Sequence, residues 1–489
     1  MNVPGASLVL APSVNCWRIE RATRATVIVD ADDYFRFARA AMLEARKRIM
    51  LIGWDFDARI DLDRRAPSPE GPTTIGDFVL WLVERSPDLE VFVLRWDLGA
   101  LNTLFRGTTM LTVFKWMRHP RIKLKLDSAH PPHASHHQKI VVLDDTLAFC
   151  GGIDMTEDRW DTRAHTDGDP HRRQVSGKPS GPWHDATTAL EGPVAAALGQ
   201  LARERWERAG GAPLAAVSAG SECWPAEMAA QFRDVDIAIA RTAPELDERP
   251  PVLEIEQLYL DLIAAATRCI YFENQYFASR RIARALAARL REKRGPEIIV
   301  VNPCEAKGWL EPLFMDTTRA RLYEALRRCD HEGRFRIYHP VTRNGTDIYV
   351  HAKIMVVDDV ALRVGSSNLN SRSMRLDTEC DVLLATTLAA NAACGPTIRA
   401  FRDGLLAEHF AMDAQEITAR ISRSQSIIAV IEELRAATPS LRPYETPDLS
   451  SVEEWLGSHD VLGAGDEEEP FEPLSRRKLL GRRRSQSTK

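Results

Sequence analysis

A short pattern occurs twice in this chain with the same internal spacing. The first copy reads HQKIVVLDDTLAFCGGID, from His137 to Asp154, and the second reads HAKIMVVDDVALRVGSSN, from His351 to Asn368. Each copy places His, Lys and Asp at the same offsets and then reaches a Gly-rich stretch at the same distance. Such a repeat predicts two similar halves that contribute to one shared site.

The length and composition are those of a globular protein with more than one domain. The chain has 489 residues, which exceeds what one hydrophobic core usually serves. Hydrophobic residues make up 44% and charged residues 27%, with a formal net charge of −5. A general nucleic-acid binder would usually be basic, so we expect no nucleic-acid partner. The 8 cysteines stand singly, without a C-x-x-C pair or zinc-type spacing, which favours a reducing compartment.

No segment predicts a secretory signal or a membrane span. The first residues lack a basic stretch, and their short apolar run is interrupted by prolines. No run approaches the roughly 18 to 20 apolar residues that a bilayer crossing needs. We therefore expect a cytoplasmic protein, or one that is peripheral at the membrane. Secretion by a route independent of a signal peptide is the alternative.

Strand-like and helix-like runs alternate along both halves, which is typical of α/β architecture. Residues 26–57 predict strand, helix and strand, and further strands are predicted at 91–97 and 122–128. The second half repeats this order before its copy of the pattern. Residues 161–181, rich in Gly, Pro, Asp and His, predict a long loop of the kind that serves as a lid or binding loop.

The predicted domain boundaries follow the repeat. We place a first half at 1–215, a connecting segment at 216–250, a second half at 251–412 and a C-terminal extension at 413–489. The extension contains an acidic patch at 466–469 and a basic tail at 476–489, which we expect to be disordered. The tail could bind anionic lipid, at about 1 kcal/mol per Lys or Arg, or simply keep the protein soluble.

The His and Lys of each copy are expected to share one face of a strand. The runs IVVL and IMVV are strand-like, and side chains two residues apart project together. His137 therefore projects with Lys139, and His351 projects with Lys353.

The remaining residues of each copy predict a turn and a close backbone approach. Asp144 and Asp358 lie in turn-like composition, so we expect carboxylates that bond to local backbone. The strand then resumes toward the Gly-rich stretch, and Gly would let an anion meet main-chain N–H groups there. These residues are Gly151, Gly152, Gly365 and Ser366.

Together the two copies supply the groups that phosphodiester chemistry needs without a metal or cofactor. One His would attack phosphorus and form a phosphohistidine, while the other protonates the leaving alkoxide and then activates water or an alcohol. Lys139, Lys353 and Asn368 would hold the non-bridging oxygens. Asp154, which replaces Asn368 in the first copy, cannot donate to a phosphate oxygen and is assigned a structural hydrogen-bonding role. No acidic metal cluster is visible in the sequence.

The doubled pattern resembles the double HKD signature of the phospholipase D superfamily. Further segments resemble phospholipase D proper in the same order, over roughly Thr26 to Phe410; they are GWDFD, SHHQK, GGID followed by RWD, PWHD with EGP, YFENQYF, and GSSNLNSRSM with DTE. The resemblance implies two similar α/β/α sandwich domains with mixed sheets, related by pseudo-twofold symmetry, with the site at their interface. It also implies that Asp185 and Glu379 orient the two imidazoles; Asp377 and Asp381 compete for the second of these roles.

The resemblance implies a phospholipase D that cleaves the distal phosphodiester of a glycerophospholipid, such as phosphatidylcholine, to phosphatidic acid and an alcohol. Its partner would be phospholipid at a membrane surface; the oligomeric state stays open. By analogy with the family, His137 would be the nucleophile and His351 the general acid. A phosphatidyltransferase such as a cardiolipin synthase is the nearest alternative, although those enzymes usually carry N-terminal spans. A nuclease or DNA-repair phosphodiesterase is less favoured, as is a lipid-binding scaffold, because both motifs are intact.

Other side chains are weaker candidates. His136 should face the opposite side of its strand and have a structural role. His165 and His171 lie in the long loop and are expected to be solvated. Several aromatic residues could form an apolar mouth for a lipid or hold a choline group by cation–π attraction, although core packing is the simpler role for any one of them. They are Trp54, Trp160, Trp183, Tyr276 and Phe277.

Overall fold

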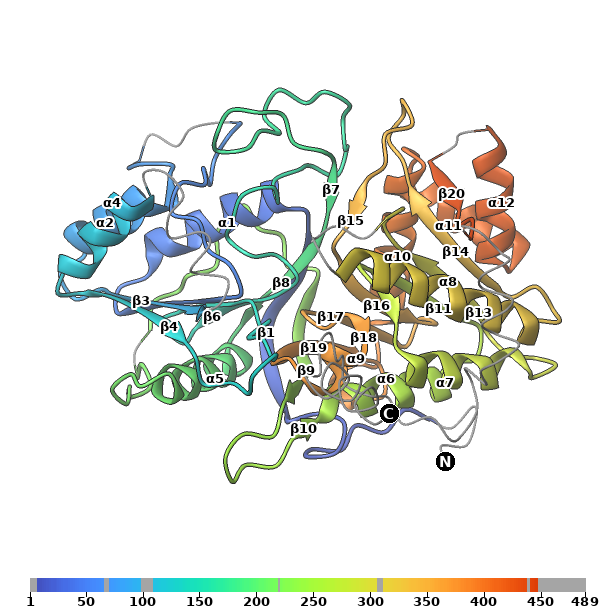
Figure 1. Cartoon of the computed structure of the whole chain (residues 1–489), viewed down its shortest axis with the longest axis horizontal. Helices are drawn as coiled ribbons and strands as arrows, with labels where there is room; N and C mark the ends of the chain where they lie inside the picture. Colours follow the sequence, from blue (N-terminus) through green and yellow to red (C-terminus); the bar gives the residue numbers. More distant parts are fainter. Residues whose placement is uncertain are drawn as a thin grey trace, which may run out of the picture.

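The computed structural model describes residues 7–65, 70–97, 109–218, 220–305, 311–437 and 440–446. Over these ranges helices cover both faces of a large mixed sheet (Figure 1), which confirms the predicted α/β class. The acidic patch at 466–469 and the basic tail at 476–489 lie outside the described residues. No helix in the described ranges combines the length and apolar character that a bilayer crossing requires.

The first half builds its part of the sheet in the order β4-β3-β2-β5-β6-β8-β1. The strands β2, β3 and β4 run parallel, and the pairs from β2 through β5, β6 and β8 to β1 are antiparallel. Its strands are β1 (Arg18–Val29), β2 (Arg48–Gly53), β3 (Glu90–Trp96), β4 (Ile122–Asp127), β5 (Ile140–Leu143), β6 (Leu147–Gly151) and β8 (Ala186–Glu191). Its helices are α1 (Ala31–Glu44), α2 (Ile75–Arg85), α4 (Thr109–Arg118) and α5 (Pro193–Arg208).

The second half repeats this order and these strand directions as β14-β13-β11-β16-β17-β19-β9, with β20 added beyond β14 and β10 paired to β9. Its strands are β9 (Phe232–Ala243), β10 (Val252–Leu253), β11 (Cys269–Asn274), β13 (Glu297–Val301), β14 (Phe335–Pro340), β16 (Lys353–Val357), β17 (Ala361–Gly365), β19 (Glu379–Ala385) and β20 (Leu441–Pro443). Its helices are α6 (Glu254–Ala265), α7 (Arg280–Leu290), α8 (Glu311–Cys329), α9 (Ser371–Arg375), the 3-10 turn Ala389–Asn391, α10 (Gly395–His409), α11 (Ala414–Ser424) and α12 (Ile427–Ala437).

The two half-sheets are continuous, because β1 and β9 occupy equivalent positions and pair with each other in antiparallel register from Arg18–Ile239 to Ala25–Phe232. The result is a single 16-stranded sheet rather than two separate ones. Residues 216–250, which the sequence suggested as a connection, therefore include one of its central strands. The region after 412 likewise adds α11, α12 and β20 to the second half. The domain boundaries themselves stay predictions.

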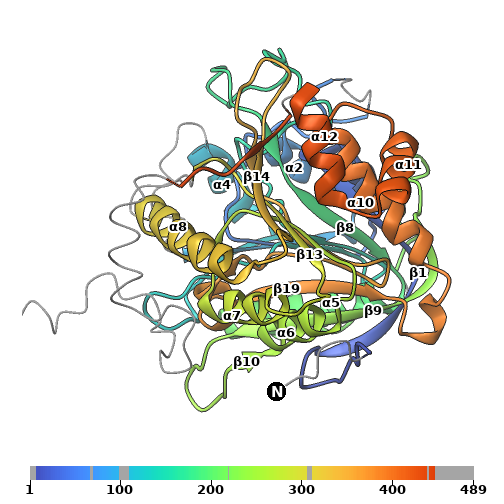
Figure 2. The same cartoon turned by 90° about the vertical axis from the view of Figure 1, so that its right-hand side faces the viewer.

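Three apolar clusters explain how the layers hold together. One lies between the first half-sheet and α1 and α2, and a second lies between the second half-sheet and α6, α7 and α8. The third spans both halves and includes buried residues of α5, α10, α11 and α12. Figure 2 shows α10 to α12 on the side of the sheet opposite α6 and α7. Cys150 of β6 and Cys380 of β19 meet in the spanning cluster, with their sulfurs 3.7 Å apart, as small buried residues.

Two further short sheets join segments of different parts of the chain. The strand β7 (Trp183–His184) pairs in parallel with β15 (Tyr349–Val350), so that the two halves are linked directly before His351. The strands β12 (Phe277–Ala278) and β18 (Leu369–Asn370) pair within the second half. The long segment at 161–181 contains turns and no regular strand or helix, as the sequence predicted.

Candidate active site

The aspartates of the repeated pattern anchor the ends of neighbouring strands. Asp144 and Asp358 follow β5 and β16 at φ 49° and 52°, in the left-handed region where Asp is tolerated. The Asp144 carboxylate accepts hydrogen bonds from the backbone N–H groups of residues 46–48, at 2.6–2.8 Å. The Asp358 carboxylate accepts from those of residues 267–269, at 2.8–2.9 Å. The structural role is as expected, but these partners lie 89 to 98 residues away, so the expectation of local bonds was wrong.

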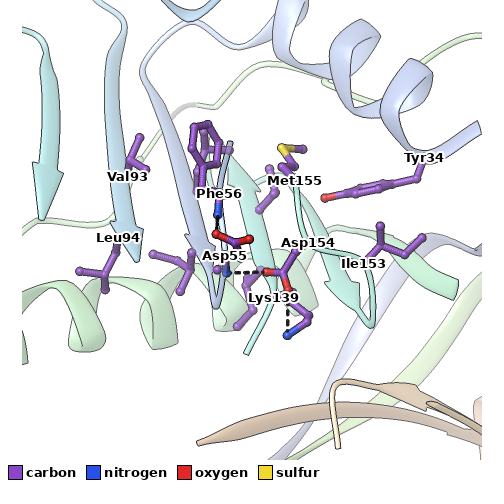
Figure 3. Close-up of a pocket in the computed structure, with 14 residues that line it drawn as sticks. Tyr34, Asp55, Phe56, Val93, Leu94, Lys139, Ile153, Asp154 and Met155 are labelled. Carbon is purple, nitrogen blue, oxygen red and sulfur yellow. Dashed lines mark hydrogen bonds and ion pairs between the residues drawn. The ribbon is translucent and has the colours of Figure 1, made fainter. Parts of the chain in front are cut away.

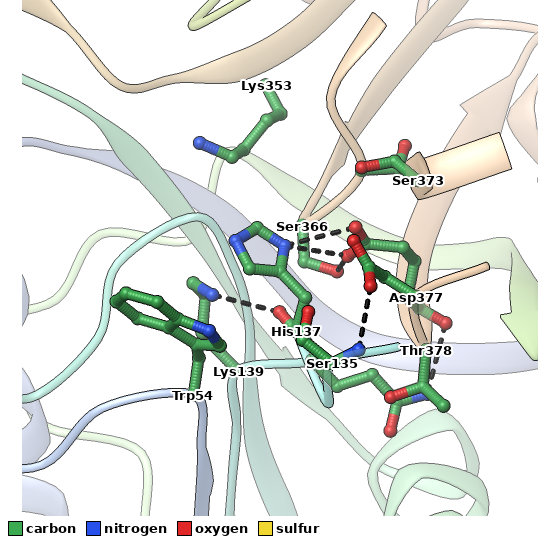
Figure 4. Close-up of polar contacts among 12 residues, drawn as sticks. Trp54, Ser135, His137, Lys139, Lys353, Ser366, Ser373, Asp377 and Thr378 are labelled. Atoms are coloured by element: carbon green, nitrogen blue, oxygen red, sulfur yellow. Dashed lines mark hydrogen bonds and ion pairs between the residues drawn. The ribbon is translucent and has the colours of Figure 1, made fainter. Parts of the chain in front are cut away.

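His137 is held by an acid from the other half of the molecule. Its Nδ1 lies 3.0 Å from both carboxylate oxygens of Glu379, and its backbone N–H donates to Thr378 O at 2.9 Å. Glu379 is fully buried and also accepts a 2.5 Å hydrogen bond from the Ser366 hydroxyl. Figure 4 shows Trp54 and the two lysines on one side of the His137 ring and Ser366 and Asp377 on the other.

His351 is held by an acid from the first half of the molecule. Its Nδ1 lies 2.6 Å from Asp185 Oδ2, and its backbone N–H donates to His184 O at 2.7 Å. Asp185 is fully buried, and its other oxygen accepts from Ala186 N at 2.8 Å. Each half therefore supplies the imidazole for one pair and the carboxylate for the other.

Each imidazole meets an acid of the other half because backbone segments of the two halves run parallel at two places. Residues 135–137 lie beside 377–379, where His136 and Thr378 form a β-bridge. The strand β15, just before His351, lies beside β7, just before Asp185. In both places the segment that precedes an imidazole runs alongside the segment that precedes or carries the acid of the other half.

The two competing acids have other partners. Asp377 accepts a hydrogen bond from Ser135 N at 2.7 Å and forms an ion pair with Arg372 at 2.8 Å. Asp381 forms a buried ion pair with Arg363. Glu379 is thus the carboxylate in this segment that contacts His137 Nδ1.

The Gly-rich stretches do not offer backbone N–H groups to an anion, contrary to our expectation. Gly152 N donates to Ala186 O at 2.8 Å, and Ser366 N donates to Cys380 O at 3.1 Å. Small residues are needed here for packing instead. A side chain on Gly151 would collide with Thr187, one on Gly152 with the Asp185 carboxylate, and one on Gly365 with Asp381. The glycines therefore make room for buried polar side chains, including the acid that holds His351.

The two lysines lie beneath the imidazoles in different surroundings. Lys139 Nζ donates to His137 O at 2.9 Å and forms an ion pair with Asp154 at 3.1 Å (Figure 3). Asp154 Oδ1 also accepts from Trp54 N at 3.0 Å, which agrees with the structural role assigned to it. Lys353 Nζ donates to His351 O and lies 3.3 Å from Gln275 Oε1. The cavity beside Lys139 and Asp154 measures about 20 Å³, which is room for about one water molecule and none for a substrate.

Both imidazoles line one larger cavity of about 620 Å³. Asn368 lines it as well, and one end of its amide is buried without a hydrogen-bond partner among the described residues. The aromatic wall of the cavity consists of Trp54, Trp96, Trp183, Tyr276 and Tyr349. Of the aromatic candidates from the sequence, Trp160 and Phe277 are instead buried in the core.

Arg159 is a cavity residue that our sequence reasoning missed. Its guanidinium lies over the Trp183 ring, 4.3 Å from the centroid, and its Nε is buried without a hydrogen-bond partner in the part of the chain that the structure describes. It belongs to the RWD segment that follows GGID, a resemblance that pointed to the region without singling out the Arg. A cation at this place suits an anionic ligand.

Burial controls the protonation of the site. Burial lowers the pKa of His137 well below its ordinary range, and the Lys139 and Lys353 charges lower it further. Burial likewise lowers the pKa of His351, helped by Lys353 and Arg159. The pKa of Glu379 rises to about 8 because it is buried, although the Ser366 hydrogen bond opposes the rise. The site therefore disfavours a charged imidazole until an anion approaches.

The three other histidines from the sequence have different surroundings. His136 is buried, with Nε2 3.0 Å from Asp127 and Nδ1 3.0 Å from Thr378 Oγ1, which fits the structural role expected of it. His171 is exposed, as predicted. His165 was expected to be solvated and is not, because the long loop folds it against buried carboxylates.

Two family models match the chain. The model described as Phospholipase D matches residues 41–283, and the model described as Cardiolipin synthase, PLD-like domain, matches residues 259–394. The first range includes His137 and Lys139, and the second includes His351 and Lys353.

Curated relatives and a solved structure agree with these matches. Phospholipase D alpha 1 of Carica papaya is 26% identical over 514 residues, which cover 76% of this chain and 63% of that protein. Phospholipase D alpha 1 of Brassica oleracea var. capitata is 23% identical over 596 residues, covering 90% of this chain and 72% of that protein. The chain thus spans 63% of the length of the papaya relative.

The crystal structure of phosphatidylserine synthase from Haemophilus influenzae Rd KW20 has a TM-score of 0.51 at 12% identity, covering 84% of this chain and 96% of that one; at this identity the likeness concerns the fold. Because the two family models together span residues 41–394, including both copies of the repeated pattern, the chain belongs to the phospholipase D superfamily.

Proposed function

We propose that this protein is a phosphodiesterase that hydrolyses the distal phosphodiester of glycerophospholipids, such as phosphatidylcholine, to phosphatidic acid and a free alcohol. One observation carries the proposal. His137 and His351 line the same cavity, and each imidazole has its Nδ1 on a buried carboxylate of the opposite half. Two oriented imidazoles on one cavity suit a double displacement at phosphorus.

In the first displacement, His137 Nε2 forms a bond to phosphorus while the bond to the head-group oxygen breaks. His351 donates its proton to that oxygen, so the alcohol leaves neutral. In the second displacement, a water molecule gives a proton to His351 and attacks phosphorus. The phosphorus–nitrogen bond breaks, phosphatidic acid leaves, and both imidazoles return to their starting states.

In this proposal four side chains stabilise the phosphate oxygens, although neither Lys is among the described residues that line the cavity. Lys139 and Lys353 lie under the two imidazoles, and Asn368 and Arg159 line the cavity itself. Positive charge and amide donors stabilise the charge on non-bridging oxygens through both displacements. Since Lys139 is paired with Asp154, we assign its role to the field on the phosphate rather than to a freely mobile contact.

Two features support a lipid substrate at a membrane surface. The aromatic wall offers apolar contacts to a lipid and cation–π contacts to a choline group, worth about 0.5–2 kcal/mol. On α4, the side chains of Leu111, Phe114 and Met117 are 67%, 55% and 69% exposed and recur every three residues on one face. Lys115 and Arg118 in the last turn of α4 add positive charge that anionic lipid attracts.

The test compares phosphatidic acid release from phosphatidylcholine vesicles with cleavage of an oligonucleotide, with EDTA added to half of the assays at the start. We expect lipid hydrolysis with and without EDTA and no oligonucleotide cleavage. A His331→Ala variant removes an exposed histidine and serves as the matched control, with activity unchanged. Oligonucleotide cleavage without release of phosphatidic acid would instead identify a nuclease.

Phosphatidyl transfer is the second candidate function, because residues 259–394 match the cardiolipin synthase model. The covalent intermediate can be attacked by an alcohol as well as by water. Adding ethanol or glycerol to the same vesicle assay distinguishes the two. A transferase would form phosphatidyl-alcohol at low acceptor concentration, whereas a hydrolase would form mainly phosphatidic acid until the alcohol is abundant.

We expect kcat/KM to be highest at acidic pH. The active free protein has one proton on the His137–His351 pair, and burial lowers the pKa of both rings. Because the pKa of His351 lies below the ordinary histidine value of about 6.5, the general acid already loses its proton below that pH, and kcat/KM should fall as pH rises toward neutrality. Bound phosphodiester is an anion, which raises the pKa of the nearby imidazole, so the alkaline limb of kcat should lie at higher pH than that of kcat/KM. Both profiles follow from rates measured between pH 4 and 9, and a kcat/KM optimum above pH 8 would contradict the assignment.

A further inference from the structure

A second group of histidines and acids lies at the boundary between the halves, outside the cavity described above. Asp30 follows β1, His165 lies in the long loop, and His184 is in β7, all in the first half. Glu408 comes from α10 of the second half. All four side chains are nearly inaccessible, at 0–4% exposed, and none of them lines the catalytic cavity.

The four side chains converge on one point with spacing that suits a metal ion. His165 Nε2 lies 3.1 Å from Glu408 Oε1 and 3.6 Å from Asp30 Oδ2. His184 Nδ1 lies 3.0 Å from Glu408 Oε1 and 3.3 Å from Asp30 Oδ1. One atom of each residue can be chosen so that all four lie within 4.8 Å of one another. Tetrahedral ligands about 2.0–2.1 Å from Zn²⁺ are separated by roughly 3.3 Å, which falls within this range.

In both His165 and His184, the ring nitrogen that faces away from Asp30 and Glu408 contacts another carboxylate. His165 Nδ1 lies 3.0 Å from Asp161, which also forms an ion pair with Arg172. His184 Nε2 lies 2.7 Å from Glu273, which in turn accepts from Tyr271 OH at 2.6 Å. A carboxylate on the far nitrogen is the usual way in which proteins fix the tautomer and direction of a metal-binding histidine. It directs His165 Nε2 and His184 Nδ1 toward Asp30 and Glu408.

Two atoms of the group have unmet bonding capacity. Asp30 Oδ2 and His184 Nδ1 are buried and make no hydrogen bond within the described residues. The balance of buried charges also favours a cation at this place. The four buried carboxylates of this region, Asp30, Asp161, Glu273 and Glu408, exceed the two guanidinium groups that pair with them, Arg163 and Arg172, by two negative charges when the imidazoles are neutral. A divalent cation would supply the missing charge and bind the unpaired atoms.

We propose that Asp30, His165, His184 and Glu408 form a structural site for a divalent transition metal of the Zn²⁺ type. With four protein ligands the ion would keep no open position, which is the pattern of a structural rather than a catalytic centre. It would join α10 of the second half to three segments of the first.

The proposed metal site would also fix the position of Asp185, the acid that orients His351. His184 directly precedes Asp185, whose backbone N–H donates to Asp30 Oδ1 at 3.0 Å. The carbonyl oxygen of His184 accepts the backbone N–H of His351 at 2.7 Å. A metal on His184 and Asp30 would therefore hold the backbone on which the His351–Asp185 pair depends.

The test measures metal on the full chain and needs no assay of activity. Protein produced in Zn²⁺-supplemented medium and then desalted should retain about one equivalent of zinc by elemental analysis. After removal of zinc with a chelator, titration with Co²⁺ should give the intense visible absorption of a four-coordinate ion, and the melting temperature should rise as metal is restored. A wild-type protein that retains no zinc, gives no such absorption and keeps its melting temperature would overturn the proposal. In that case protons on His165 and His184 balance the charge, as the neighbouring carboxylates favour by raising the pKa of His165 to about 10 against the effect of burial.

Variants distinguish this site from others. Glu408→Gln and His165→Gln keep nearly the size of the native side chains and should weaken Zn²⁺ binding at least about 10- to 100-fold. His331→Gln, at an exposed position, is the matched control and should bind like the wild type. Retention of zinc by both site variants, with loss in His339→Gln, would move the ion to the group formed by Cys304, His339 and Asp347 and contradict the assignment.

Discussion

Replacing His137 with Ala is expected to abolish the phosphoenzyme and to lower kcat by about 10⁴-fold or more, because the variant lacks the nucleophile that attacks phosphorus in the proposed reaction. His351→Ala should lower kcat by about 10²- to 10⁴-fold, the usual contribution of a general acid. Although the two imidazoles have similar surroundings, the two variants should differ in where the reaction stops.

The choice of substrate makes this difference visible. A phosphatidyl ester with a nitrophenol leaving group needs no protonation, so the His351→Ala variant should still form the covalent intermediate and then hydrolyse it slowly. Label from the phosphatidyl group should therefore accumulate on His351→Ala and be absent from His137→Ala. Label retained on His137→Ala and lost from His351→Ala would reverse the two roles. The His331→Ala variant provides the control for turnover and for the melting temperature.

Replacing the orienting acids should have the second-largest effect. Glu379→Gln and Asp185→Asn keep the shape of the side chain but can favour the wrong tautomer of the imidazole, and such changes cost about 10²- to 10⁴-fold in kcat. Because the pairs are crossed, each acid variant should resemble the histidine variant of the opposite half. Glu379→Gln should slow formation of the labelled intermediate, and Asp185→Asn should slow its breakdown with the nitrophenyl ester.

The matched control for these variants is Asp377→Asn. Asp377 is a buried acid two residues from Glu379, but it bonds Ser135 and Arg372 rather than an imidazole. We expect its effect on kcat to be less than about tenfold, since Asp377 lines the cavity and affects His137 only through its charge, without a hydrogen bond to either ring. Rate constants for label formation and decay, measured with the melting temperature of each variant, provide the comparison. Equal losses for Asp377→Asn and Glu379→Gln, or a slow first step in Asp185→Asn alone, would contradict the crossed arrangement.

Much of the fold and the centre of the candidate site could be predicted from the sequence. The repeat predicted two halves, and the alternation of runs predicted the strands before each copy of the pattern, because apolar periodicity reports which face of an element is buried. The spacing of His137 and Lys139, and of His351 and Lys353, predicted that each pair shares one strand face. In the structure both His lie just before β5 and β16, and neither Lys is among the described residues that line the cavity of the imidazoles. Asp185 and Glu379 came from the resemblance.

The tertiary structure alone determined which acid serves which imidazole, since the paired residues lie 166 and 242 positions apart and no local pattern records such a contact. It also joined the half-sheets through β1 and β9, and showed that Gly152 makes room for Asp185 rather than for an anion. His165 was misjudged for the same reason: a polar loop reads as solvated until the buried carboxylates that it packs against, such as Glu408, are known. Local patterns reflect the periodicity of single elements, whereas the surroundings of a buried charge depend on every segment that packs against it.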